Sequence, residues 1–139
     1  MNNSVKFSAT AIFAVGLLLA GAGSASAATT LTVDPATGLT DGQVVSVAAA
    51  GFTANETVTI LECVNSETDV ACDLANQGAA TTDDTGTAAT TYAVHSAFTG
   101  VNPLTGKTTG PVDCTTGAGC SLIALDSAFA YASAPIAFG

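Results

Sequence analysis

The chain has 139 residues, the size of a single domain, and eleven acidic residues against two lysines and no arginine give it a formal net charge of −9. This charge argues against direct contact with nucleic acid, because the chain lacks the cations that neutralise phosphates. Hydrophobic residues make up 48% of the chain, which is too many for a disordered acidic tail. With one histidine and no arginine, the chain has few groups for acid–base or phosphoryl chemistry.

The first 27 residues have the pattern of an export signal. Lys6 precedes an apolar run over 9–22, and Ala25-Ser26-Ala27 forms a small-x-small cleavage site. The apolar run is shorter than the ~20 residues of a membrane span, which favours a cleaved signal peptide over a membrane anchor. We therefore expect residues 28–139 to be a secreted domain that does not contact a membrane and is a monomer.

The part after residue 27 reads as short β-strands separated by turns. Apolar residues alternate with threonine and other small residues, as they do on half-buried strands. In chain order the alternating pairs are Leu31 and Val33, Val45 and Val47, Val58 and Ile60, Tyr92 and Val94, Ile123 and Leu125, and Ile136 and Phe138. About seven such strands in a domain of this size indicate an all-β sandwich of immunoglobulin type. An antibody-type domain is disfavoured because the chain has no tryptophan to pack on an inter-sheet disulfide.

Four cysteines, at positions 63, 72, 114 and 120, all follow the export signal. An even count in an exported chain indicates two disulfides. Sequence proximity favours Cys63–Cys72 and Cys114–Cys120, although three pairings are possible. A zinc site is the competing interpretation, but no Cys-x-x-Cys is present and His95 is the single histidine, so no metal is expected.

No group of residues predicts catalysis. No motif places a serine or cysteine nucleophile near His95, which is expected at the surface end of a strand. The adjacent Asp83 and Asp84 are typical of a turn rather than of a calcium loop. The sequence therefore predicts a protein that is not an enzyme and has no catalytic residues.

Several segments together resemble the neocarzinostatin family of secreted actinobacterial apoproteins. They are Thr-Val-Asp-Pro-Ala-Thr-Gly-Leu-Thr-Asp-Gly at 32–42, Asp-Asp-Thr-Gly-Thr-Ala at 83–88, His-Ser-Ala-Phe at 95–98, and Val-Asp-Cys-Thr-Thr at 112–116 with Cys120. The resemblance implies a seven-stranded, immunoglobulin-like antiparallel sandwich with local disulfides Cys63–Cys72 and Cys114–Cys120. It also implies a cleft that holds an enediyne chromophore non-covalently. In that family the released chromophore cuts DNA, whereas the protein carries and protects it.

The resemblance also implies the positions that would contact the small hydrophobic ligand. They are Leu61, Cys63, Asn65, Val70, Cys72, Leu104, Ser121, Ile123 and Leu125, with Gln77 nearby. The family has glycine where this chain has Leu61 and Ile123, and tryptophan where it has Asn65. A flat polycyclic ligand needs aromatic walls and room for the backbone to approach it, and these differences remove both.

Two interpretations of these differences remain open. In the first, the cleft is reshaped for a more aliphatic ligand and lies open between Leu61, Val70 and Leu125. In the second, the aliphatic side chains fill the cleft, and the protein is a secreted immunoglobulin-like structural or interaction module that binds no chromophore.

Overall fold

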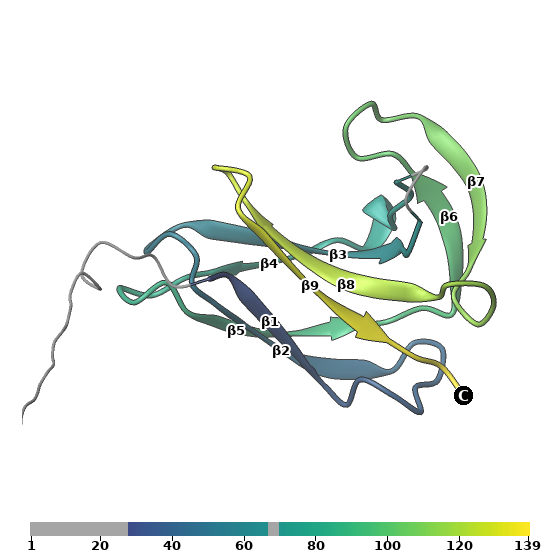
Figure 1. Cartoon of the computed structure of the whole chain (residues 1–139), viewed down its shortest axis with the longest axis horizontal. Helices are drawn as coiled ribbons and strands as arrows, with labels where there is room; N and C mark the ends of the chain where they lie inside the picture. Colours follow the sequence, from purple (N-terminus) through teal and green to yellow (C-terminus); the bar gives the residue numbers. More distant parts are fainter. Residues whose placement is uncertain (1–27, 67–69) are drawn as a thin grey trace, which may run out of the picture.

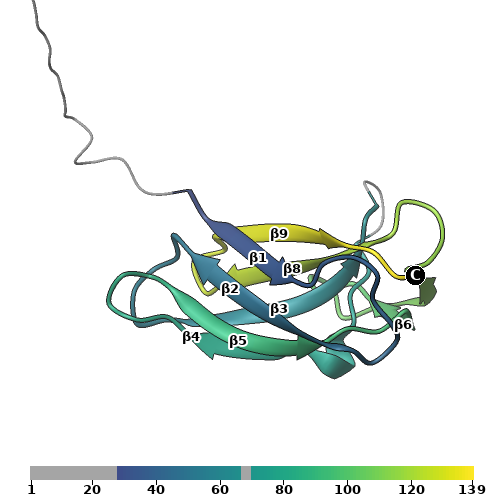
Figure 2. The ribbon, with the colours of Figure 1, turned by 90° about the horizontal axis from the view of Figure 1, so that it is seen from below.

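Two antiparallel β-sheets pack face to face in the computed structural model, which describes residues 28–66 and 70–139 (Figure 1). The three-stranded sheet has the order β1-β2-β5 and the four-stranded sheet has the order β4-β3-β8-β9. Their bounds are β1 (Thr30–Asp34), β2 (Val44–Ala50), β5 (Ala88–Ala93), β4 (Gly78–Thr81), β3 (Thr57–Val64), β8 (Cys120–Asp126) and β9 (Tyr131–Ile136). Figure 2 shows the same two layers from below. The predicted signal peptide, at 1–27, lies outside the described residues.

The alternation seen in the sequence produces the core between the sheets. Along β2, Val45, Val47 and Ala49 are buried while their neighbours are exposed or half-buried, and β9 alternates in the same way. Successive side chains of a strand point to opposite faces, so one face of each sheet contributes to a shared apolar interior. The seven strands of the two sheets confirm the predicted all-β, immunoglobulin-like sandwich.

A two-stranded ribbon extends the sandwich and was not predicted from the sequence. It consists of β6 (Ala97–Val101) and β7 (Thr108–Asp113), and it rises beyond one end of the four-stranded sheet (Figure 1). The segment around Cys72 joins it to the sandwich. The Cys72 N–H donates to the Val101 carbonyl at 2.9 Å, and the Val101 N–H donates back to the Cys72 carbonyl at 3.0 Å. The ribbon is thus held beside β3 through Cys72.

Both disulfides are local, as predicted. Cys63 at the end of β3 pairs with Cys72, and Cys114 after β7 pairs with Cys120 at the start of β8. A short 3₁₀ turn, η2 (Leu74–Asn76), follows the first disulfide. Within 28–66 and 70–139, no helix has the length and hydropathy of a membrane span.

Candidate functional site

The outer face of the four-stranded sheet carries an apolar cluster that is separate from the core. Leu61 and Cys63 of β3 alternate with core residues, so their side chains point away from the three-stranded sheet. Leu61 pairs with Ile123 of β8 in the strand register, and Cys63 pairs with Ser121. We call the set Leu61, Cys63, Cys72, Leu74 and Ile123 the outer cluster.

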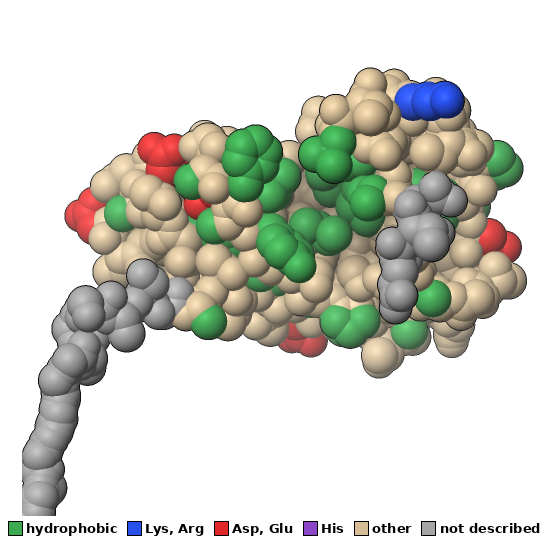
Figure 3. All heavy atoms as spheres, turned by 45° about the horizontal axis from the view of Figure 1, so that its top comes forward, with side chains coloured by type: hydrophobic (Ala, Val, Ile, Leu, Met, Phe, Trp, Pro, Cys, Tyr) green, Lys and Arg blue, Asp and Glu red, His purple; other side chains and the backbone are tan. Residues whose placement is uncertain are grey.

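The outer cluster is well packed although it lies outside the sandwich. Leu61 has only 5% of its surface exposed, and Ile123 and Leu74 pack against it and the Cys63–Cys72 disulfide. Figure 3 shows hydrophobic side chains gathered where the ribbon rises from the body of the sandwich. The solvent side of an antiparallel sheet is normally polar. An apolar floor at this place therefore suits contact with a nonpolar molecule.

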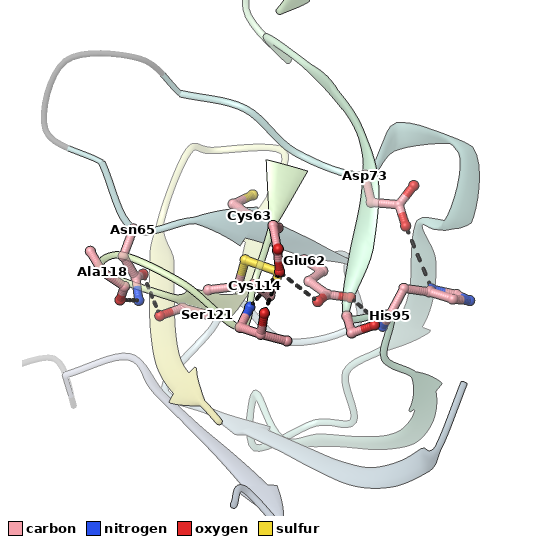
Figure 4. The surroundings of a disulfide bond; sticks show 12 residues. Glu62, Cys63, Asn65, Asp73, His95, Cys114, Ala118 and Ser121 are labelled. Atoms are coloured by element: carbon pink, nitrogen blue, oxygen red, sulfur yellow. Dashed lines mark hydrogen bonds and ion pairs between the residues drawn. A yellow bond between two sulfur atoms is a disulfide. The ribbon is translucent and has the colours of Figure 1, made fainter. Parts of the chain in front are cut away.

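Asn65 and Ser121 form a polar brace at one end of this floor. The Ser121 hydroxyl donates to Asn65 Oδ1 at 2.7 Å, and Asn65 Nδ2 donates to the Ala118 carbonyl at 3.1 Å (Figure 4). The Asn65 backbone N–H donates to the Gly119 carbonyl at 2.9 Å. Asn65 thus ties the end of β3 to the loop of the second disulfide, and its amide is committed to that structural role.

The other predicted site residues lie around the floor rather than in it. Leu125, the next outward residue of β8, is half-buried opposite Thr59. Val70 and Leu104 are exposed on two loops, and 80% of the Leu104 surface is accessible. Gln77 is exposed immediately after η2. The structure therefore brings Leu61, Cys63, Cys72 and Ile123 together in one cluster and leaves Val70 and Leu104 outside it.

A cavity of about 560 Å³ lies between the first cysteine loop and the ribbon. Its lining residues are Val64, Ser66, Ala71, Asn102, Thr105, Lys107, Thr108, Thr109, Pro111 and Val112. None of these was predicted as a site residue, although several adjoin predicted ones in the sequence. Lys107 is among these lining residues. It is the single lysine or arginine after residue 27, and this was the signal that could have drawn attention to it.

A buried polar group lies behind the first disulfide. Glu62 is fully buried on the core side of β3, and its Oε1 accepts the His95 backbone N–H at 2.8 Å (Figure 4). Asp73 is also buried, and its Oδ2 lies 3.6 Å from His95 Nδ1. Burial raises the pKa of Glu62 to about 7; the hydrogen bond from His95 opposes this rise, and the charges of Asp73 and Asp41 add to it.

Comparisons of sequence and of structure with known proteins all match the same family. The sequence model of the neocarzinostatin family matches residues 31–138. The antitumor antibiotic C-1027 apoprotein of Streptomyces globisporus is 37% identical over 134 residues, which is 96% of this chain and 92% of the relative. Actinoxanthin of Streptomyces globisporus matches with the same identity and coverage. The solved structure of macromomycin superimposes with a TM-score of 0.74 at 32% identity, over 81% of this chain and 100% of the other.

Proposed function

Because the chain belongs to the neocarzinostatin family, we propose that it is a secreted apoprotein that binds and protects a small hydrophobic chromophore of enediyne type. The chromophore would be held without a covalent bond and would supply the DNA-damaging, antimicrobial chemistry. The protein itself would act as a monomeric carrier, not as an enzyme. Its export would depend on residues 1–27.

The outer cluster is the observation that supports this proposal most directly. It places a packed, nonpolar floor on the side of the sheet that would otherwise face solvent. The ribbon stands beside this floor because Cys72 is hydrogen-bonded to β6. A floor with a wall next to it is the concave, mostly apolar arrangement that small-molecule sites share.

The side chains present fit a ligand held by aliphatic contacts. Leu61 and Ile123 contribute branched hydrocarbon to the floor, and Leu125 continues the outward face of β8. Asn65 is a brace rather than a stacking surface, since its side-chain amide is hydrogen-bonded at both ends. Among the proposed contact residues there is no aromatic ring. The expected ligand is therefore more aliphatic, or has a smaller flat portion, than a polycycle that stacks between rings.

The acidity of the chain agrees with a carrier role. The part after residue 27 contains all eleven acidic residues and one lysine, Lys107, so the protein is unsuited to binding DNA phosphates. Any action on DNA would belong to the ligand. A negatively charged carrier would also attract a ligand that bears an amine.

The same cluster favours a second candidate function. Only 5% of the Leu61 surface is exposed, so the neighbouring residues already bury this side chain without a ligand. A cluster that is complete in itself would suit a secreted immunoglobulin-like structural or interaction module that binds no chromophore. The two candidates differ in whether the floor gains contacts from a ligand.

Native mass spectrometry of the protein secreted by its own producing culture tests the proposal. A carrier gives a species heavier than the apoprotein, and the added mass leaves on denaturation without breaking a covalent bond. Recovery of the apoprotein alone, together with no binding of any nonpolar probe at micromolar concentration, would support the module instead.

A further inference from the structure

Three potential metal ligands from distant parts of the chain converge beside the first disulfide. Glu62 lies on β3, Asp73 follows Cys72, and His95 follows β5. One ligand atom from each lies within 4.8 Å of the ligand atoms of the other two. No metal was expected from the sequence, because no Cys-x-x-Cys is present, His95 is the single histidine, and Asp83 and Asp84 are typical of a turn. All four cysteines are paired in disulfides, and the convergent groups are two carboxylates and an imidazole.

The two carboxylates are buried without a permanent cation beside them. Glu62 has 0% and Asp73 has 2% of its surface exposed. The chain has no arginine, and Lys107 is exposed in the turn of the ribbon. Buried carboxylates are costly unless a positive charge or a proton compensates them. An imidazolium at His95 or a bound cation would supply that charge.

Two buried polar atoms next to the carboxylates lack a hydrogen-bond partner in the described structure. One is His95 Nδ1, which faces Asp73, and the other is the hydroxyl of Tyr92. Tyr92 is 4% exposed on the core side of β5. Burial raises the pKa of Tyr92, the charges of Glu62 and Asp73 raise it further, and an interaction with the Glu62 backbone opposes the rise. A buried polar atom without a hydrogen bond costs about 1–3 kcal/mol, so His95 Nδ1 beside Asp73 calls for a partner.

We propose that Glu62, Asp73 and His95 bind one Zn²⁺ ion. Zinc takes nitrogen and carboxylate oxygen ligands at about 2.0–2.2 Å in a tetrahedron, which separates two ligand atoms by roughly 3.4 Å. The 3.6 Å between His95 Nδ1 and Asp73 Oδ2 is close to that separation. A mixed nitrogen and oxygen set favours zinc over magnesium or calcium, which prefer oxygen ligands alone.

Hydrogen bonds already orient the proposed ligands. Asn76 Nδ2 donates to Asp73 Oδ2 at 2.9 Å and to Oδ1 at 3.2 Å. The His95 backbone N–H donates to Glu62 Oε1 at 2.8 Å, and Cys114 Sγ lies 3.4 Å from Glu62 Oε2. Because Cys114 is in a disulfide, its sulfur has no proton to donate to that oxygen. Such supporting bonds are typical of metal sites, where they fix the direction of each ligand. An ion here would join β3, the Cys72 segment and the chain leading into β6.

The single histidine makes the test direct. Zn²⁺ is titrated into the secreted, tag-free protein with its disulfides intact, near pH 7.5, and binding is followed by calorimetry and by the ¹⁵N signals of the imidazole. The proposal predicts one ion per chain and a large shift of the Nδ1 signal. Because the chain has one histidine and its cysteines are oxidised, this signal reports on the proposed site alone.

Matched variants distinguish zinc binding at the proposed site from nonspecific attraction of Zn²⁺ to the other acidic residues of the protein. Asp73→Asn and His95→Ala should each weaken zinc binding by about tenfold or more, as removal of a ligand or its support does. Asp84→Asn removes the same charge from an exposed turn and should change affinity less than about twofold. Circular dichroism checks that each variant is folded. If a variant does not fold, the titration of the wild-type imidazole signal still tests the proposal.

Three results would overturn the proposal. One is a folded wild-type protein whose Nδ1 signal does not move in the presence of excess Zn²⁺. Another is equal zinc affinity in the wild type and the His95→Ala variant. The third is an equal response to Mg²⁺ in place of Zn²⁺, which would indicate attraction to surface carboxylates. None of these results depends on whether the protein carries a chromophore.

Discussion

Leu61 on β3 and Ile123 on β8 are register partners on the outer face of the four-stranded sheet. Two branched aliphatic side chains therefore meet where the resemblance to the neocarzinostatin family places two glycines. Their contact builds the floor of the outer cluster and connects it to the Cys63–Cys72 disulfide.

Leu61→Ala should destabilise the fold, although Leu61 lies outside the main core. Removing a buried leucine side chain that packs on Ile123, Leu74 and a disulfide costs about 2–4 kcal/mol. Urea unfolding measures the loss. Leu104→Ala is the matched control, because Leu104 is exposed and its truncation should change stability by less than about 0.5 kcal/mol. Equal effects of the two variants would show that the outer cluster is not packed as described.

Gly100→Ala should disturb the packing of the ribbon against the first cysteine loop. A Cβ at Gly100 would lie 2.7 Å from Thr109 Oγ1 and 2.8 Å from the Ala71 Cβ. Overpacking of this kind costs about 1–3 kcal/mol. Gly78→Ala is the matched control, since a Cβ there meets its nearest atom, in the Tyr92 ring, at 3.4 Å. Thermal unfolding of the two variants should differ, and a tolerated Gly100→Ala would contradict the close approach.

Loss of the first disulfide should loosen the ribbon more than loss of the second. Each disulfide closes a short loop and contributes about 2–3 kcal/mol, so both double Cys→Ser variants should be less stable. Among the four cysteines, Cys72 is hydrogen-bonded to β6 itself, through Val101, whereas the Cys114 N–H donates to the carbonyl of Ser96, just before β6. Amide hydrogen exchange over 97–113 should therefore accelerate more in the Cys63→Ser/Cys72→Ser protein than in the Cys114→Ser/Cys120→Ser protein. Equal acceleration would show that Cys72 does not hold the ribbon.

Asp113 should make stability fall on acidification. Its Oδ1 accepts the Thr115 hydroxyl at 2.6 Å and the Thr115 N–H at 2.9 Å, and these bonds lower the pKa of Asp113 below 3.8. A lowered pKa means that this stabilisation is complete above the ordinary pKa and is lost as the pH falls through the folded-state value. Asp113→Asn should therefore lose less stability than the wild type as the pH falls from above the ordinary pKa of aspartate to below it.

The control for the acid measurement is Asp84→Asn. Asp84 is exposed and its side chain makes no hydrogen bond within the described residues, so its variant should follow the wild type on acidification. Urea unfolding at a series of pH values gives the free energy of unfolding against pH for the wild type, Asp113→Asn and Asp84→Asn. Parallel curves for the wild type and Asp113→Asn would contradict a stabilising role for the Asp113 carboxylate.

The sandwich was predictable from the sequence because its strands alternate clearly. Val45 and Val47, or Val58 and Ile60, show a period of two that fixes both the strand and its buried face. The strands β4 and β6 lack this signal. Gly-Ala-Ala-Thr at β4 has no large apolar residue, and β6 is held by hydrogen bonds to Cys72 rather than by an alternating face. The ribbon depends on a contact between segments that local periodicity does not encode.

The candidate site was predictable in part. Leu61, Cys63, Cys72 and Ile123, which the family resemblance implies as contact residues, come together in the outer cluster. Val70 and Leu104 lie on loops and are exposed. The convergence of Glu62, Asp73 and His95 was not visible in the sequence, because these residues are 11 to 33 positions apart and belong to no spaced motif.

The most direct test of the carrier proposal is an NMR titration of the protein with two probes of one ring skeleton. The probes are 2-naphthol, which is flat and aromatic, and decahydro-2-naphthol, which is its saturated counterpart. A floor of Leu61 and Ile123 predicts shifts in the amide signals of 61–63 and 121–125, with tighter binding of the saturated probe. If neither probe shifts these signals at millimolar concentration, or if the shifts lie elsewhere on the molecule, the outer cluster is a filled surface and the protein is not a carrier at this site.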